Sequence, residues 1–214
     1  MSSKEAAVAL YGVQAVASAA TLIWPKNRTV KIVGGSALAA VGALDRLRSV
    51  YGGDGADQLQ QVINLTLAST ATFKDPEEGL EVAMRALAIE AAIAYFASGV
   101  VKLVSPVWLK GEAFGAIIGT QTYGDKRLYS LVTKHPVLGK LVSWGTVLAE
   151  VGFPLVFVLP KPLARAYVGM MGSFHVGIGQ FMGLNRFVLA FGATHPALLH
   201  VIEQRSSGRE LPAP

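Results

Sequence analysis

The chain has 214 residues, of which 52% are hydrophobic and 15% are charged, and its formal net charge is +5. Soluble domains carry about 25% charged residues, so this chain lacks the charge that a water-exposed surface needs. Its hydrophobicity excludes intrinsic disorder. The absence of cysteine excludes disulfides, thiolate nucleophiles, thiolate zinc sites and iron–sulfur clusters. Basic residues are scattered along the chain, which argues against a nucleic-acid partner.

The first apolar run extends from Ala6 to Trp24 and is long enough to cross a bilayer. Trp suits a membrane interface, and the following Pro25 stops a helix. A cleavable signal peptide is the competing interpretation, because Ala17-Ser18-Ala19 resembles a cleavage site. The mixed charges of Lys4 and Glu5 and the continuation of the apolar run beyond that site favour the membrane span.

The second candidate span extends from Val30 to Leu47 and ends among charged residues, which lie either at the membrane boundary or inside the bundle. The stretch from Tyr51 to Asp57 is rich in Gly and Asp and predicts a loop. The run from Leu59 to Phe73 is short and polar at its start. It predicts an interfacial helix or a tightly packed one.

The third candidate span extends from Leu80 to Val104 and contains the polar residues Glu90, Tyr95 and Lys102. Short surface helices are predicted after it, up to Val137. Three further apolar runs complete the candidate spans: Leu138 to Leu159, Ala164 to about Asn185, and Phe187 to Ile202, of which the last is broken by Gly192 and by His195-Pro196.

Together these runs predict an all-α fold, a polytopic transmembrane helix bundle with about five spans and short interfacial helices. Residues 1–204 are expected to form a single transmembrane domain, and residues 205–214 a flexible polar tail. Lys and Arg occur in nearly every loop, so the positive-inside rule leaves the orientation open.

Ionisable groups at membrane depth are candidates for function, because each costs at least about 2.5–3.5 kcal/mol to insert. Lys102 either extends to the interface or is desolvated in a cavity, where it can act as a general base. Glu90 and Glu150 either make structural hydrogen bonds or polarise a pocket. His175 lies in a Gly-rich run and is either a structural residue or part of a site. The four histidines lack metal-site spacing, so no metal is expected.

One helix carries a family resemblance. The segment from Tyr95 to Leu103 (YFASGVVKL), with Trp108 and Gly111 after it, resembles the signature helix of the vitamin K-dependent γ-glutamyl carboxylase superfamily. The membrane part of that superfamily is also called the horizontally transferred transmembrane domain, or HTTM. The shared pattern is an aromatic residue, two small residues, Gly, then Lys-Leu, with Trp and Gly downstream.

Two further matches occur in the same order. The segment from Leu148 through Glu150 to Pro154 resembles the span before the Phe-His motif of bacterial members. The segment from Phe174 to Gln180 (FHVGIGQ), followed by Phe187, is similar to that motif itself. The matches cover roughly residues 80–190.

In the carboxylase, the lysine that Lys102 matches is the base that deprotonates reduced vitamin K, and the chemistry that follows forms an epoxide and carboxylates peptide glutamates. The resemblance therefore implies a quinone-linked, carboxylase- or epoxidase-like oxidoreductase with Lys102 as base. The expected cofactor is a quinone, such as menaquinone or its hydroquinone form. The candidate site residues are Lys102 and His175 as catalytic groups, and Glu90, Tyr95, Glu150 and Gln180 as cofactor-binding groups.

Two other functions remain open. The chain is too short for the large domain that holds the substrate propeptide in the eukaryotic carboxylase. A non-catalytic membrane subunit that binds a membrane or secreted peptide, for maturation or complex assembly, is therefore an alternative. DoxX-like quinone-associated membrane proteins share a similar Gly-to-Lys helix, so a redox accessory of that type is another. All three place the chain in the cell membrane as a multi-pass protein with the lipid bilayer as a partner.

Overall fold

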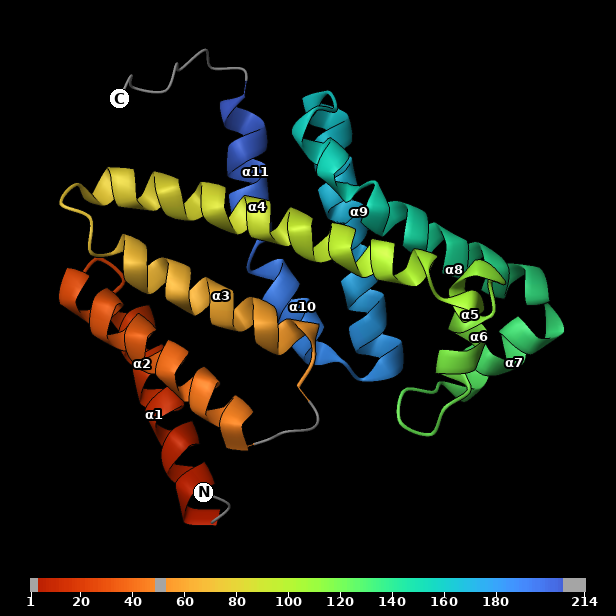
Figure 1. The fold of residues 1–214 in the computed structure, drawn as a ribbon, viewed down its shortest axis with the longest axis horizontal. Coiled ribbons are helices and arrows are strands. Elements are labelled where there is room, and N and C mark those ends of the chain that lie inside the picture. Colours follow the sequence, from red (N-terminus) through yellow and green to blue (C-terminus); the bar gives the residue numbers. More distant parts are fainter. Residues whose placement is uncertain (1–3, 49–52, 206–214) are drawn as a thin grey trace. The chain divides into compact units, whose positions relative to one another are not determined.

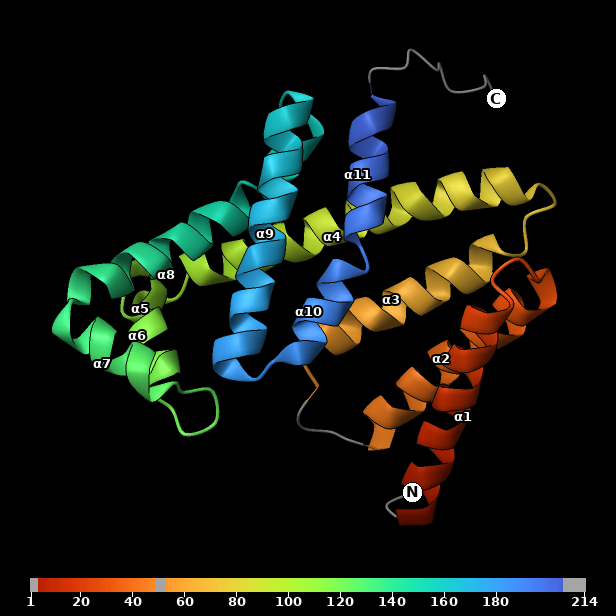
Figure 2. The same ribbon diagram turned by 180° about the vertical axis from the view of Figure 1, so that it is seen from behind.

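The computed structural model describes residues 4–48 and 53–205, and every regular element in these ranges is a helix (Figures 1 and 2). This confirms the all-α prediction. The contacts divide the chain into two compact units, residues 1–90 and residues 91–214, and each is described by itself. The helices are α1 (Lys4–Ile23), α2 (Arg28–Arg48), α3 (Gly55–Thr70), α4 (Pro76–Leu103), α5 (Pro106–Leu109), α6 (Ala113–Ile118), α7 (Lys126–Lys134), α8 (Pro136–Val151), the 3-10 helix η1 (Phe153–Phe157), α9 (Lys161–Met182), α10 (Asn185–Gly192) and α11 (His195–Gln204).

Two helices of the described chain, α1 and α4, are long and apolar enough to cross a membrane by length and composition. They correspond to the spans predicted at residues 6–24 and 80–104. With 28 residues, α4 is roughly 42 Å long at 1.5 Å per residue, which exceeds the hydrocarbon thickness of a bilayer. The other predicted spans form helices that do not meet the same criterion.

The span predicted at residues 138–159 is not one continuous helix. The α-helix α8 ends at Val151, and η1 follows after Gly152. Pro154 has no backbone N–H and its ring crowds the preceding turn, so the α-helical hydrogen-bond ladder cannot continue through it. The last apolar run is divided where Gly192 and His195 predict a break, since α10 ends at the first and α11 begins at the second.

In the first unit, α1 packs against α2, and α2 packs against α3 (Figure 1). Small residues allow α2 and α3 to approach closely, because a Cβ on Gly35 would lie 3.0 Å from the Cβ of Ala68. Gln61 of α3 donates from Nε2 to the carbonyl of Ala39, 2.7 Å away. Asp54 caps the start of α3.

The turn after α3 is held by Arg28 at the start of α2. Its Nε donates to the carbonyl of Ala71 at 3.0 Å, and its Nη2 donates to the carbonyl of Thr72 at 2.5 Å. These carbonyls follow the last helical residues, where no intrahelical donor is available. Arg28 therefore ties the α1–α2 turn to the end of α3.

The second unit contains two groups of packed helices. In the first group, α9 contacts α10, α11 and η1 (Figure 2). Glu203 near the end of α11 pairs with Lys161 at 3.4 Å and accepts from Arg165 Nε at 2.6 Å. The hydrogen bond from Arg165 holds the pKa of the Glu203 carboxyl below its usual range. These contacts join the start of α9 to the end of α11.

In the second group, α5, α6 and α7 pack against α8. The buried Ser143 of α8 accepts a hydrogen bond from the backbone N–H of Phe114 at 3.0 Å. Its hydroxyl lies 2.8 Å from the carbonyl of Gly139 and 3.2 Å from that of Gly111, so it can donate to either. Gly111 has a φ of +71°, which favours glycine. One hydroxyl therefore fixes the α5–α6 turn on α8.

Two predictions fall partly outside the described residues. The loop predicted at residues 51–57 is described from Gly53 onward, and α3 begins within it at Gly55. Of the predicted tail, Arg205 is described, and its Nη2 donates to the carbonyl of Leu159 at 2.7 Å. Residues 206–214 of the tail lie outside the described residues.

Candidate functional site

A buried ion pair joins α4 to α8 in the second unit. The Nζ of Lys102 lies 2.6 Å from Oε2 of Glu150, and the two side chains are 17% and 7% exposed. Removing a charge from water costs several kcal/mol, so an ion pair this buried requires both partners. The ammonium group of Lys102 is therefore directed to Glu150 of α8.

The remaining donors of Lys102 also have partners. Nζ lies 2.7 Å from Oγ of Ser98, one helical turn earlier, and 3.4 Å from the Ser98 carbonyl. It is also 5.1 Å from the centre of the Trp108 ring, within the range of a cation–π contact. The lysine is thus held in one orientation by α4 itself, by α8 and by the residues after α4.

Gly99 permits the close approach that forms the ion pair. A Cβ at this position would lie 2.7 Å from the backbone nitrogen of Val151 and 3.0 Å from the Cβ of Glu150. Only a residue without a side chain fits there, so α4 contacts the end of α8 along its backbone. This glycine belongs to the motif that carries the family resemblance, and its physical role is to bring Glu150 within reach of Lys102.

An aromatic cluster surrounds the buried Tyr95, which lies one helical turn before Gly99 on α4. The Tyr95 ring is 4.2 Å from Phe153 of η1, 4.9 Å from Phe191 of α10 and 5.6 Å from His175 of α9, measured between ring centres. The His175 imidazole stacks on Phe191 at 4.1 Å and 14°. Phe187 lies on the same stack, 6.2 Å from His175. Four separate elements therefore meet at His175 and Tyr95.

Several polar atoms in this cluster are buried without a hydrogen-bond partner in the described chain. They are the Tyr95 hydroxyl, both ring nitrogens of His175 and Nε2 of His195. Tyr95 is 2% and His175 is 4% exposed, so bulk solvent does not reach them. A buried polar group left unpaired costs about 1–3 kcal/mol, and such groups usually bind an ordered water or a ligand. The cluster therefore has unused hydrogen-bonding capacity.

His195 is a site residue that sequence reasoning did not identify. Its ring packs against α9 at Gly172, where a Cβ would lie 2.8 Å from the His195 Cε1. In the sequence, His195 stood out only as part of the His195-Pro196 break, and the four histidines lack metal-site spacing. The useful sequence signal was the glycine three residues before His175, because a helical glycine can accept an aromatic ring from a neighbouring helix.

Tyr167 is a second residue that was missed. Its hydroxyl donates to the carbonyl of Ala149 at 2.7 Å. That carbonyl lies in the last turn of α8, where Gly152 and Pro154 end the regular hydrogen-bond ladder. Tyr167 thus satisfies the backbone next to Glu150. No local sequence pattern indicates that Tyr167 of α9 would reach this carbonyl, because the contact depends on how the two helices pack.

The structure brings together most, but not all, of the predicted site residues. The second unit contains the ion pair and the aromatic cluster, formed by Lys102, Glu150, Tyr95 and His175. Gln180 is exposed on α9 and does not belong to the buried group. Glu90 is half-buried and belongs to the first unit, so it is not assigned to this site. Within the described ranges, no three His, Asp or Glu side chains are grouped as a metal site requires.

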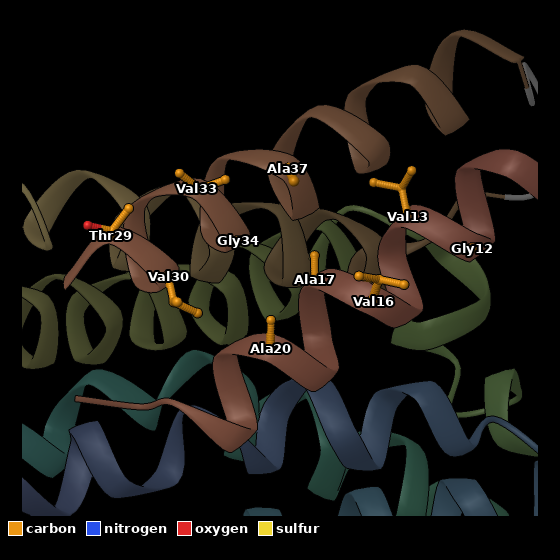
Figure 3. A pocket seen from close by; sticks show the side chains of 10 residues that line it. All are labelled: Gly12, Val13, Val16, Ala17, Ala20, Thr29, Val30, Val33, Gly34 and Ala37. Atoms are coloured by element: carbon orange, nitrogen blue, oxygen red, sulfur yellow. The ribbon is translucent and has the colours of Figure 1, made fainter. Parts of the chain in front are cut away.

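The first unit contains a groove of a different character between α1 and α2 (Figure 3). Its volume is about 560 Å³, and small or β-branched residues line it, among them Gly12, Val16, Ala20, Val30 and Gly34. The only hydroxyl in its lining is that of Thr29. The groove offers apolar contact but no acid, base or nucleophile.

The candidate site lies in the second unit and contains two kinds of buried polar group. It combines a buried ion pair, in which Lys102 Nζ also contacts Ser98, with buried imidazole and phenol groups that lack partners among the described residues. No protein-family model matches the chain, and neither a curated protein nor a solved structure matches it.

Proposed function

We propose that this chain is a multi-pass protein of the cell membrane whose second unit binds a quinone-type ligand and acts on it as a carboxylase- or epoxidase-like oxidoreductase. The observation that carries the proposal is the buried, unpartnered Tyr95 and His175 in an aromatic cluster. Tyr95 lies seven residues before Lys102, so the two residues share one face of α4. The resemblance to the vitamin K-dependent carboxylase superfamily supports the same ligand class.

The hydrogen-bonding groups suit both redox forms of a quinone. A neutral imidazole has one donor nitrogen and one acceptor nitrogen, and a phenol can donate or accept. His175 and Tyr95 can therefore donate to the carbonyls of a quinone and accept from the hydroxyls of a hydroquinone. The rings of Phe187 and Phe191 provide the flat apolar surface against which His175 is already stacked.

The ion pair suggests how Lys102 could act as a base. With Glu150 ionised, Lys102 holds its proton and cannot accept another. Transfer of that proton across the 2.6 Å contact to Oε2 gives a neutral amine and a neutral carboxylic acid, and burial lowers the cost of this transfer because no charge then remains out of water. The Nζ lone pair can then accept a proton from an acidic hydroxyl. The base function of Lys102 therefore depends on Glu150 as the first proton acceptor.

Membrane placement rests on the low charge of the chain and on α1 and α4. We propose that the apolar helices α2, α8 with η1, and α9 complete about five crossings. The buried charges of Lys102 and Glu150 neutralise each other, which reduces the cost of placing them at membrane depth.

The ligand class is tested by mass spectrometry of organic extracts from the full chain, purified in mild detergent. A quinone is expected in the extract, and its amount is expected to fall about tenfold or more in a His175→Phe variant, because that change removes both ring nitrogens but keeps a ring on the stack. Gln180→Ala, which alters an exposed residue of the same helix, is the control and should retain the quinone. A parent extract without quinone would reject the proposed ligand.

A non-catalytic membrane subunit is the second candidate, and one observation favours it. All the donors of Lys102 are already used by Glu150 and Ser98, as expected for a residue that only joins two helices. In that case a Lys102→Met/Glu150→Met variant would still assemble with its peptide or protein partner. A DoxX-like redox accessory would retain the quinone in the same variant, since it needs no base.

A further inference from the structure

The helix α7, labelled in Figure 1, is amphipathic, and seven of its nine residues are exposed. Its inward face is formed by Leu128 and Val132, which are half-buried. Val132 packs against α6 and α8, since its Cγ1 would lie 3.5 Å from a Cβ on Gly115 and 2.8 Å from a Cβ on Gly139. One face of α7 is therefore occupied by its own unit.

The opposite face of α7 is cationic. Lys126, Ser130 and Lys134 follow one another at four-residue spacing, Arg127 lies beside them, and all four are exposed. None of the three cations forms an ion pair with any residue that the structure describes. Asp125 is the nearest acid in sequence, and its carboxylate accepts from the backbone N–H groups of Arg127 and Leu128 at 3.0 and 2.8 Å.

Helix stability does not explain two of these charges. The start of a helix carries partial positive charge and favours acidic side chains. Lys126 and Arg127 occupy the first turn of α7, where a cation is unfavourable. Their position therefore indicates a partner outside the helix, with negative charge.

The borders of this face indicate which kind of partner. Tyr129 and Leu131 flank the cations and are 48% and 45% exposed. On α8, Val137 and Leu141 are exposed one turn apart. Cationic residues bordered by exposed aromatic and aliphatic side chains are typical of helices that lie in the headgroup layer of a membrane.

We propose that the outward face of α7, formed by Lys126, Arg127, Ser130 and Lys134, binds the anionic phospholipid headgroups of the bilayer. This inference rests on the membrane placement proposed above but not on the quinone site. It assigns α7 as an interfacial anchor, which places the α6–α8 end of the second unit at a membrane surface.

The absence of cysteine allows a specific probe, because a single Ser130→Cys variant can be labelled on the cationic face with no competing thiol. The full chain, labelled there with a fluorophore, is reconstituted into phosphatidylcholine nanodiscs that contain a small fraction of headgroup spin-labelled lipid. Quenching by spin-labelled phosphatidylglycerol is expected to exceed quenching by spin-labelled phosphatidylcholine at least about fivefold, the enrichment that one basic residue near an anionic surface supplies.

A Lys126→Gln/Arg127→Gln/Lys134→Gln variant is expected to abolish this preference. The matched control is Lys4→Gln/Lys26→Gln/Lys74→Gln, which removes three exposed lysines from the first unit and should keep the preference. Equal quenching by the two lipids in the parent would overturn the proposal, as would a preference that survives the α7 substitutions or disappears in the control. A chain that does not remain with the nanodisc would instead overturn the membrane placement itself, and this inference with it.

Discussion

Lys102→Met is expected to lower the free energy of unfolding by about 3–5 kcal/mol, because it leaves the Glu150 carboxylate buried without its cation. Met preserves most of the length and the apolar stem of the side chain. The measurement is a denaturant titration of the full chain in detergent, followed by circular dichroism. Glu150→Met is expected to have a similar effect, since it strands the Lys102 ammonium group.

The double variant Lys102→Met/Glu150→Met separates the cost of leaving one buried charge without its partner from the cost of losing the ion pair itself. Because replacing both members of a buried ion pair by apolar residues is often neutral or stabilising, the double variant should be more stable than either single variant. The control is Arg85→Met on the same helix. Arg85 pairs with Glu81 at 2.7 Å, but the two side chains are 45% and 33% exposed, so its removal should cost about 0.5 kcal/mol or less. Equal effects of Lys102→Met and Arg85→Met would contradict the buried ion pair.

Gly99→Ala is expected to destabilise the chain by about 1–3 kcal/mol, although alanine is the better helix former. The added Cβ would lie 2.7 Å from the backbone nitrogen of Val151, which cannot move aside as a flexible side chain can. The helices α4 and α8 must then separate, and the Lys102–Glu150 contact lengthens with them. The effect is measured by the same unfolding titration.

Gly145→Ala on α8 is the matched control for this substitution. A Cβ at position 145 meets nothing within 4 Å, so only helix propensity changes and the variant should gain up to about 1 kcal/mol. Gly99→Ala is therefore expected to lower the free energy of unfolding, and Gly145→Ala to raise it. A stabilising Gly99→Ala would show that α4 does not approach α8 at this point.

The sequence predicted the local features of the site well. The length and apolar content of the run from Leu80 to Val104 located α4, and the polar interruptions of that run identified Tyr95 and Lys102. Each of these signals is contained in one stretch of chain, which is why sequence alone could provide them. The break of the last apolar run at His195-Pro196 was predicted for the same reason, since proline acts on its own helix.

Features that depend on tertiary contact could not be predicted. The pairing of Lys102 with Glu150 depends on Gly99 meeting the backbone of α8, and the roles of Tyr167 and His195 depend on which helices pack together. The length of α8 was overestimated because hydropathy continues through Pro154, whereas the hydrogen-bond ladder does not. Hydropathy measures apolar content and not helix continuity. The helices α2 and α9 have 21 and 22 residues, but α1 and α4 are the two described helices that are both long and apolar enough to cross a membrane.

We propose that the aromatic cluster around Tyr95 and His175 binds a quinone-type ligand. The most direct test is isothermal titration of the full chain in detergent with a short-chain menaquinone analogue, compared between the parent and His175→Phe. We expect saturable binding by the parent and an affinity weaker by about tenfold or more in the variant, since both ring nitrogens are lost. No saturable binding by the parent, or equal affinity of the two proteins, would contradict it.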